Sequence, residues 1–217
     1  MNKIKTLAGL GWTMVAAVAL SGCGRNEVEP LGELEFAAPE PGVRTIAVVG
    51  TPVVAAETIE TTAAYVKAQW RTHVRAGRVR SADHAQPEEN DVCLLILDRA
   101  DAAALDPIAS LAVEEDRAVL NVAAFQPTEV VGEGPAAGFQ PLVNKEAMRG
   151  IGLMLGMEPC PFPRCALHAA DSLQDLRNKG QNYCPPCQMK SEEALQRHNL
   201  ERGVRTPPTP HGGDCTV

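Results

Sequence analysis

The sequence predicts an α/β domain with a mixed sheet, packed helices and a cysteine-rich C-terminal end. Apolar strand patterns alternate with amphipathic helix patterns along the chain from residue 44 onward. One of them, Asp91–Asp98, is apolar on both faces, which is typical of a central strand covered on both sides. Proline, glycine and cysteine then dominate residues 158–187. We therefore expect a single folded domain over residues 44–202, with its cysteine-rich region at 158–188.

The order of the elements follows from the periodicity of apolar residues. The first expected helix, residues 55–74, has a broad apolar stripe beside charged residues, and the stripe includes Ile59, Ala63 and Val66. The expected strands are a buried strand at 44–49, a short strand at 78–81, the central strand at 91–98 and a strand at 117–125. The expected helices are 55–74, an Ala-rich turn between the last two strands, 144–156, 172–178 and 189–201. The Pro/Gly-rich tail, residues 203–217, is expected to be disordered.

The first 22 residues have the pattern of a secretory signal. Lys3 and Lys5 precede an uncharged apolar run that is too short for a confident membrane span. The run ends in Leu-Ser-Gly-Cys at residues 20–23, which matches the lipobox of bacterial lipoprotein precursors. We expect residues 1–22 to be a signal peptide and Cys23 to carry diacylglycerol and an acyl chain such as palmitate. Two or more acyl chains would anchor the protein stably, with residues 24–43 as a tether.

The net charge and the composition restrict the classes of molecule that the protein could bind. The formal net charge of −7 becomes −9 once the two signal-peptide lysines are removed, and aromatic residues make up 4% of the chain. An acidic chain with few aromatic residues is a poor candidate for binding nucleic acid or for electrostatic attachment to anionic lipid. The residue after Cys23 is Gly24, with no acidic retention signal. We expect a lipid-anchored protein of the cell envelope, on the periplasmic side of the outer membrane if the cell is Gram-negative.

Four cysteines form the most specific chemical pattern in the chain. Cys160 and Cys165 make one short-spaced pair, Cys184 and Cys187 a second, and 18 residues separate the pairs. Two such pairs at this separation are typical of a zinc site, in which each pair forms a knuckle and the two knuckles enclose one ion. Four sulfur ligands leave no open position for water or substrate. The predicted cofactor is therefore one structural Zn²⁺ per chain.

Two other interpretations of these cysteines stay open. Thiols of exported proteins are often oxidised, so the four could instead form two disulfides. Cys184 and Cys187 could also form a thiol redox pair, although the residues before them are polar and do not predict the strand that such a pair needs. Cys93 is expected to be a small core residue, and the sequence assigns no role to Cys215. His168 is close enough in sequence to be a spare ligand, but a solvated histidine is the simpler interpretation.

The stretch from Lys145 to Cys187 resembles the archaemetzincins, a branch of the metzincin zinc metallopeptidases. The resemblance rests on Gly156, which matches the turn glycine of the family motif, and on the four cysteines. Upstream, the order of strand, long helix, central strand and further strand is also similar. A metzincin-like fold for the domain is what this resemblance implies.

The same resemblance implies that the catalytic residues are lost. In this sequence Arg149, Leu153 and Pro159 stand at the three positions where the family has zinc-binding histidines, and Gly150 stands at the position of the general base glutamate. Leucine and proline have no ligand atom, arginine repels Zn²⁺ and glycine has no carboxylate. Leu167 replaces the methionine below the site. The implied protein is a degenerate relative that is not a peptidase by the family mechanism.

Four functions remain to be tested, and the fourth, which the sequence does not separate from the first, is a lipoprotein with a purely structural role. The first is a non-catalytic lipoprotein that binds a peptide or protein of the envelope through the former substrate cleft. The second is a thiol redox protein that uses Cys184 and Cys187. The third is a metallopeptidase with ligands from outside the family motif, such as His73 or His84.

Overall fold

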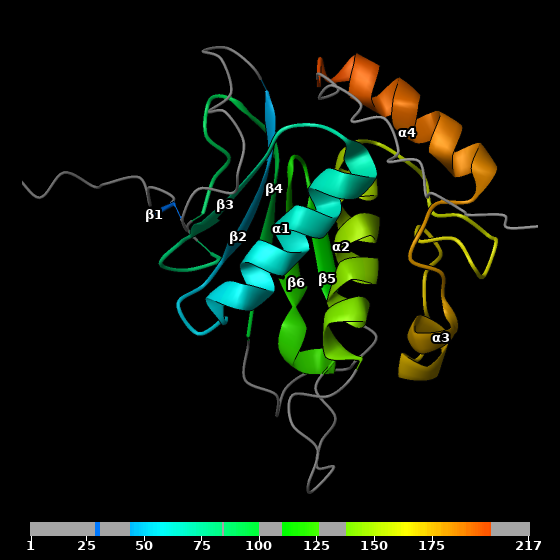
Figure 1. Ribbon diagram of the computed structural model, residues 1–217, viewed down its shortest axis with the longest axis horizontal. Coiled ribbons are helices and arrows are strands. Elements are labelled where there is room, and N and C mark those ends of the chain that lie inside the picture. The colour runs from blue at the N-terminus through cyan, green and yellow to red at the C-terminus, as the bar shows by residue number, and fades with distance from the viewer. Residues whose placement is uncertain (1–28, 31–43, 84, 100–109, 126–137, 201–217) are drawn as a thin grey trace, which may run out of the picture.

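The computed structural model describes residues 29–30, 44–83, 85–99, 110–125 and 138–200. Over these residues a six-stranded sheet has helices α1 and α2 on one face, and a C-terminal region with α3 and α4 lies beside α2 (Figure 1). The predicted α/β class with a mixed sheet is confirmed. The expected signal peptide at 1–22, the expected lipid attachment site Cys23 and the expected disordered tail at 203–217 lie outside the described residues.

The sheet is parallel in its centre and antiparallel at both edges. Its strand order is β1-β3-β2-β4-β6-β5. The expected central strand is confirmed, because β4 lies inside the sheet, between β2 and β6. The strands are β1 (Glu29–Pro30), β2 (Thr45–Gly50), β3 (Val74–Arg78), β4 (Asp91–Asp98), β5 (Leu111–Glu114) and β6 (Arg117–Asn121).

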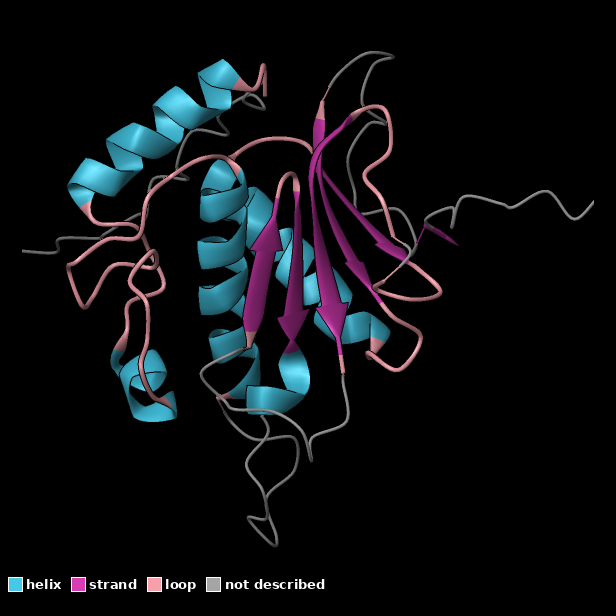
Figure 2. Ribbon diagram, turned by 180° about the vertical axis from the view of Figure 1, so that it is seen from behind, coloured by secondary structure: helices cyan, strands magenta, loops and turns pink. Residues whose placement is uncertain are grey.

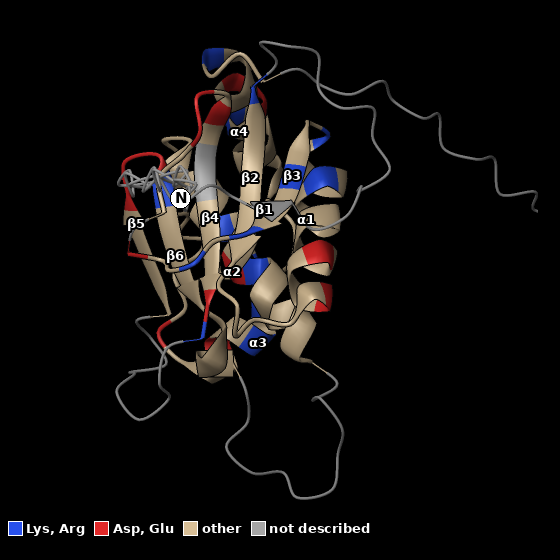
Figure 3. Cartoon of the chain, turned by 90° about the vertical axis from the view of Figure 1, so that its left-hand side faces the viewer, with Lys and Arg blue, Asp and Glu red and all other residues tan. Residues whose placement is uncertain are grey.

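Four α-helices and one 3₁₀ helix are described. Helix α1 (Ala56–Trp70) connects the parallel strands β2 and β3, and α2 (Phe139–Met154) follows the last strand. The others are η3 (Val122–Phe125), α3 (Leu173–Asn178) and α4 (Pro185–Arg197). Helix α1 has Glu57 in its first turn and Lys67 in its last, which suits the helix dipole; Figure 3 shows acidic and basic residues towards its two ends.

The sheet separates two apolar cores of unequal size. The larger core lies between the sheet and the two long helices and includes Ile46, Leu95, Leu120 and Ile151. The smaller core, on the opposite face, is formed around Ala47, Val49, Val79 and Ile96. In the described part of the chain no α-helix covers that face (Figure 2), and the loop after β3 contributes Val79, Ala82 and Ala85 to its core. Residues of one strand alternate between the two cores, as the two-residue period of a strand requires.

The region around β3 differs from its prediction. The helix expected at 55–74 ends at Trp70, and the strand expected at 78–81 is β3, Val74–Arg78. Arg71 ends the helix in the left-handed conformation, with φ 53°. Val74 and Ala76 then face the core and pair with β2. The apolar spacing over 66–76 suits both a helix stripe and a strand, so the periodicity did not locate the turn between them.

Other boundaries also differ. Residues 111–114, within the segment expected to be a helical turn, form β5, and the strand expected at 117–125 ends at Asn121, where η3 begins. Helices α2 and α4 begin earlier than predicted, and two residues of the expected tether, Glu29–Pro30, pair with β3 as β1. The helix expected at 172–178 is confirmed within one residue as α3.

Glycine allows the C-terminal region to pack closely. A Cβ on Gly152 of α2 would lie 2.7 Å from Leu167 Cδ2 and 2.9 Å from Tyr183 Oη. A Cβ on Gly180 would lie 2.0 Å from the carbonyl oxygen of Arg164, which belongs to the backbone and cannot move aside as a side chain can. Gly180 thus permits the two cysteine-bearing segments to approach each other.

We predict that Gly180→Ala destabilises the protein by about 2 kcal/mol, because overpacking against backbone forces a local shift. Gly150→Ala is the matched control. Its Cβ would meet only the ends of Leu111 and Leu95, at 3.1 and 3.3 Å, and alanine improves helix propensity by about 1 kcal/mol. Urea unfolding of the two variants measures the difference. Equal stability of both variants would contradict the close approach at Gly180.

Candidate metal centre and the adjoining face of helix α2

The structure brings the four predicted cysteines together. Cys160 and Cys165 lie in the loop after α2, Cys184 is the N-cap of α4, and Cys187 lies in the first turn of that helix. Pro185 occupies the first helical position, where its fixed φ and missing N–H carry no penalty. The segments are joined by Ala166, whose backbone N–H donates to the carbonyl of Asn182 at 3.0 Å. Each cysteine pair is thus held by a turn of its own, and a backbone hydrogen bond connects the two.

The sulfur positions fit a tetrahedral ion. The four Sγ atoms all lie within 4.8 Å of one another, and those of Cys160 and Cys184 are 3.7 Å apart. Zinc–sulfur bonds of about 2.3 Å imply a sulfur–sulfur edge of about 3.8 Å in a regular tetrahedron. A disulfide requires about 2.05 Å, and the four thiols are free in the structure. The cluster can therefore hold one zinc ion with no position left open.

The thiols differ in their environments. Burial raises the pKa of Cys165 and Cys187. Burial also acts to raise the pKa of Cys184, but hydrogen bonds from the Cys187 backbone and from the other thiols outweigh it, so that the pKa of Cys184 is lowered. The backbone N–H of Cys184 in turn donates to Cys165 Sγ at 3.4 Å. A cation placed among the four sulfurs would offset the cost of ionising the buried thiols.

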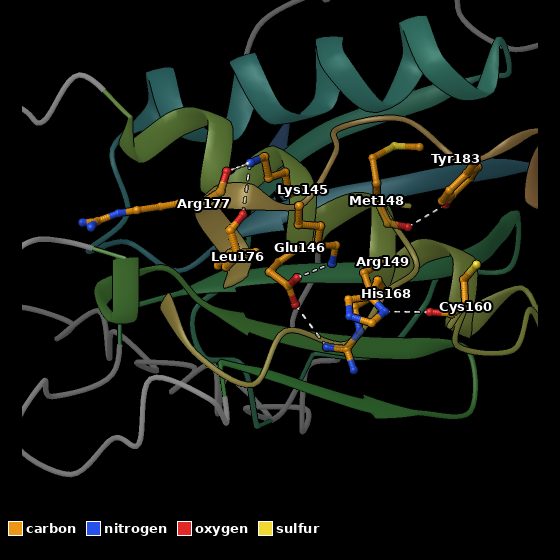
Figure 4. Close-up of polar contacts among 10 residues, drawn as sticks. Lys145, Glu146, Met148, Arg149, Cys160, His168, Leu176, Arg177 and Tyr183 are labelled. Carbon is orange, nitrogen blue, oxygen red and sulfur yellow. Dashed lines mark hydrogen bonds and ion pairs between the residues drawn. The ribbon is translucent and has the colours of Figure 1, made fainter. Parts of the chain in front are cut away.

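His168 is next to the cluster but outside it. Its Nδ1 lies 2.9 Å from the carbonyl oxygen of Cys160 (Figure 4), and the group of side chains close enough to share a metal contains only the four cysteines. Among the described residues, no other group of three or more His, Cys, Asp or Glu side chains could hold a metal ion. His73 lies in a different part of the chain, before β3, and His84 is outside the described residues.

The four residues that the family resemblance places at catalytic positions lie on α2 and just after it. Gly150 is buried, and a Cβ added to it would lie 3.1 Å from Leu111 Cδ1, so this glycine faces β5. Leu153 is half-buried on the same helix, and Pro159 is exposed in the loop that leads to Cys160. Arg149 is four-fifths buried, and its Nη1 donates to Glu146 at 3.1 Å. None of these side chains offers a metal ligand at this face.

Sequence reasoning missed a network of buried charges on α2. Glu146 is 2% exposed and accepts from Lys179 at 2.7 Å with Oε1 and from Arg149 with Oε2 (Figure 4). Lys145, 6% exposed, donates to the carbonyls of Leu176 and Arg177. Burial lowers the pKa of Lys145 and of Lys179, and Glu146 partly offsets the effect on Lys179. The one signal in the sequence was the i, i+3 spacing of Glu146 and Arg149.

No described helix has both the length and the apolar character that a membrane span requires. This finding applies to the described residues only, which do not include the N-terminal 28.

No protein-family model matches the chain. A segment of 53 residues is 43% identical to an archaemetzincin of Pyrococcus furiosus and 42% identical to one of Pyrococcus abyssi. Each match covers 24% of this chain and 28% of the length of the relative. The sequence similarity is therefore confined to about a quarter of either protein.

The fold similarity is more extensive. The crystal structure of an archaemetzincin from Methanopyrus kandleri superimposes with a TM-score of 0.59 at 16% identity, covering 74% of this chain and all of that one. A zinc-dependent peptidase from Methanocorpusculum labreanum gives a TM-score of 0.54 at 14% identity, covering 67% of this chain and 99% of that one. The chain is thus archaemetzincin-like, in its overall fold and in the sequence of one segment.

Proposed function

We propose that this protein is a membrane-anchored lipoprotein whose archaemetzincin-like domain binds an extended peptide segment of an envelope protein and does not hydrolyse it. The observation that carries the proposal is the contrast between two neighbouring sites. Four sulfurs lie in a geometry that fits structural zinc, whereas the adjoining face of α2 holds Arg149, Gly150 and Leu153 and offers no metal ligand.

Loss of hydrolysis follows from the chemistry of these residues. Metal-assisted peptide hydrolysis needs a metal with an open position for water and a general base beside it. Arg149 is a permanent cation that is engaged with Glu146, and Gly150 has no side chain to act as a base. A four-sulfur zinc site does not substitute, because it has no open position.

The edge of the sheet supports peptide binding. Strand β5 is the outermost strand on its side, and Ala112, Val113 and Glu114 are exposed. An exposed edge strand presents unpaired backbone groups to which an extended peptide can add as a further strand. Gly150 lies against Leu111 of β5, so a peptide on this edge would lie beside the α2 face.

The envelope location rests on the N-terminal sequence. Lys3, Lys5, the apolar run and the Leu-Ser-Gly-Cys pattern together support processing before Cys23 and lipid attachment to its thiol. An anchor with two or more acyl chains holds a protein on the membrane without a spanning helix. The partner of such a domain would be another component of the envelope.

One observation favours the thiol redox alternative, and another speaks against it. Cys184 caps the N-terminus of α4, and Cys187 lies one turn further, which is the arrangement of a redox-active pair. However, the residues that precede Cys184 form a loop in the structure, where such a pair follows a strand. Both sulfurs also lie within the four-sulfur group. We therefore prefer the structural metal.

We predict one zinc ion per chain, and Cys160→Ser should reduce zinc binding at least tenfold and lower the melting temperature. Removing one thiolate opens the tetrahedron, and metal binding energy at such a site is folding energy. Metal analysis, thiol titration and thermal melts measure the effects. Cys215→Ser is the control and should retain zinc. Two disulfides in place of zinc would refute the metal assignment. A second zinc ion that remains bound in Cys160→Ser would instead support the hypothesis of a metallopeptidase with other ligands.

We predict that the zinc-loaded protein binds extended peptides without cleaving them, and that Val113→Asp weakens binding at least fivefold. The introduced charge would lie on the edge strand, where it opposes strand addition. Val53→Asp is a matched control, because Val53 is also exposed but lies after β2. Anisotropy of labelled octapeptides reports binding, and mass spectrometry of the same samples reports cleavage. Specific cleavage that follows the zinc content would contradict the proposal.

We predict that Cys23→Ala abolishes incorporation of radiolabelled palmitate. The thiol of Cys23 is the only proposed attachment point for the lipid. Expression in a bacterial host, with Cys215→Ser as the control, tests this. Palmitate labelling that persists in Cys23→Ala would exclude the lipobox assignment.

A further inference from the structure

Arg149 occupies an unusual environment for a side chain that always carries a charge. It is four-fifths buried, and the partner that the structure gives its guanidinium is Glu146 Oε2, reached through Nη1. Its Nε–H is buried and has no acceptor among the described residues. A buried donor without an acceptor destabilises the fold, and more so when the donor is charged. The Nε edge of the Arg149 guanidinium therefore has no hydrogen-bond acceptor within the described part of the protein.

The neighbouring groups do not supply that acceptor. Glu146 divides its two oxygens between Lys179 and Arg149, so a single carboxylate serves two buried cations. Lys145 uses two backbone carbonyls and adds a third cation with no anion of its own. Two cations, Lys179 and Arg149, thus share one carboxylate, and the third, Lys145, has no carboxylate partner among the described residues. Lysine can lose its proton when buried, whereas arginine cannot.

The four-sulfur cluster does not satisfy Arg149 either. Four thiolates around Zn²⁺ carry two net negative charges, and the charge of Cys165 acts to raise the pKa of Lys179. The negative charge of the cluster therefore stabilises the protonated form of Lys179. The Nε–H of Arg149 has no acceptor among the described residues, and the four sulfurs are included in that statement.

We propose that Arg149 anchors a carboxylate-binding subsite on the α2 face, in which a carboxylate of the ligand accepts hydrogen bonds from the unused Nε–Nη2 edge of the guanidinium. A planar carboxylate matches that edge with two parallel N–H···O bonds. Glu146 holds the opposite side through Nη1 and so fixes the plane of the guanidinium. The inference rests on the proposed peptide-binding function, because it names the group that the bound segment presents.

The position of Arg149 in the fold suits this role. It precedes Gly150, which packs against Leu111 at the start of β5. A peptide added to the β5 edge would pass beside this part of α2 and could bring to it either its C-terminal carboxylate or a Glu or Asp side chain. The side chain of Arg149 is one-fifth exposed. Because its Nε has no exposed surface, a carboxylate reaches the guanidinium from the Nη2 end, and the side chain must turn to bring the Nε–H into the contact.

Four pools of fluorescein-labelled octapeptides test the subsite, with the full zinc-loaded chain in detergent at about 0.15 M salt to suppress non-specific attraction. The positions are randomised over Ala, Val, Thr, Ser and Gln. The first pool has a free C-terminus and the second a C-terminal amide. The third and fourth are amidated and carry Glu or Gln at one fixed internal position. Anisotropy gives the apparent Kd of each pool, and the pairs separate the two sources of carboxylate.

We expect one carboxylate pool to bind about tenfold more tightly than its neutral counterpart, as a charge-assisted bidentate contact implies. Arg149→Gln should abolish this preference while the neutral pools bind as before. Arg149→Lys keeps the charge and loses the fork, so it should also lose most of the preference. Arg177→Gln is the matched control, because that side chain is exposed on α3 and points away from Glu146 (Figure 4).

Equal binding of charged and neutral pools, or a preference that survives Arg149→Gln, would overturn the carboxylate subsite and leave the peptide-binding function intact. Failure of every pool to bind the unsubstituted protein would overturn the peptide-binding function itself. Zinc content and a thermal melt establish that each variant is folded. If Arg149→Gln fails to fold, Arg149→Lys decides the outcome, because it retains a cation beside Glu146.

Discussion

Helix α2 is enclosed on nearly all sides, and this enclosure constrains the rest of the structure. The sheet and α1 cover its apolar stripe, and the C-terminal region covers the surface that a two-layer fold would leave in water (Figure 1). Consecutive residues Lys145 and Glu146 are both buried as a result. Buried charge is tolerated only with internal partners, so the polar residues of α2 determine which groups the C-terminal region must present. Lys179 and the carbonyls at the end of α3 are those groups.

The apolar residues of the C-terminal region, such as Leu176, Leu195 and Leu200, join the main core and do not form a separate one. The two helices of this region are short or polar. Besides the polar contacts of Lys179 and the α3 carbonyls, the region is held by the four sulfurs and by two further contacts on α2. Leu167 packs against Gly152, and the hydroxyl of Tyr183 donates to the carbonyl of Met148 at 2.6 Å. Both contact residues lie within two residues of a cysteine. Closure of the sulfur cluster therefore also positions the region against α2, which is how a metal contributes to the stability of a segment too small for its own core.

The sequence predicted those features that a short local pattern encodes. The cysteine spacing indicated one cluster, and the apolar run of β4 indicated a central strand; both hold in the structure. Strand β5 was missed because its four residues, next to an Ala-rich stretch, carry no distinctive period. The buried charges were missed for a different reason. Lys145 and Glu146 have the composition of a solvated helix face, and only the distant Lys179 and the α3 carbonyls make their burial possible.

The roles of Arg149 show the same limit most clearly. In the sequence, the family resemblance places this residue where the family has a zinc-binding histidine, and nothing more follows. The structure adds that its neighbour Glu146 also serves Lys179, whose other environment is the sulfur cluster. The ion pairs Glu146–Lys179 and Glu146–Arg149 use the same carboxylate, so a change that strengthens one of them weakens the other. The two pairs differ in one respect: Lys179 is fully enclosed, whereas Arg149 reaches the surface. The charge of Lys179 can be neutralised only by groups of the protein itself. The positive charge that remains without a full partner is therefore that of Arg149, which a ligand can reach.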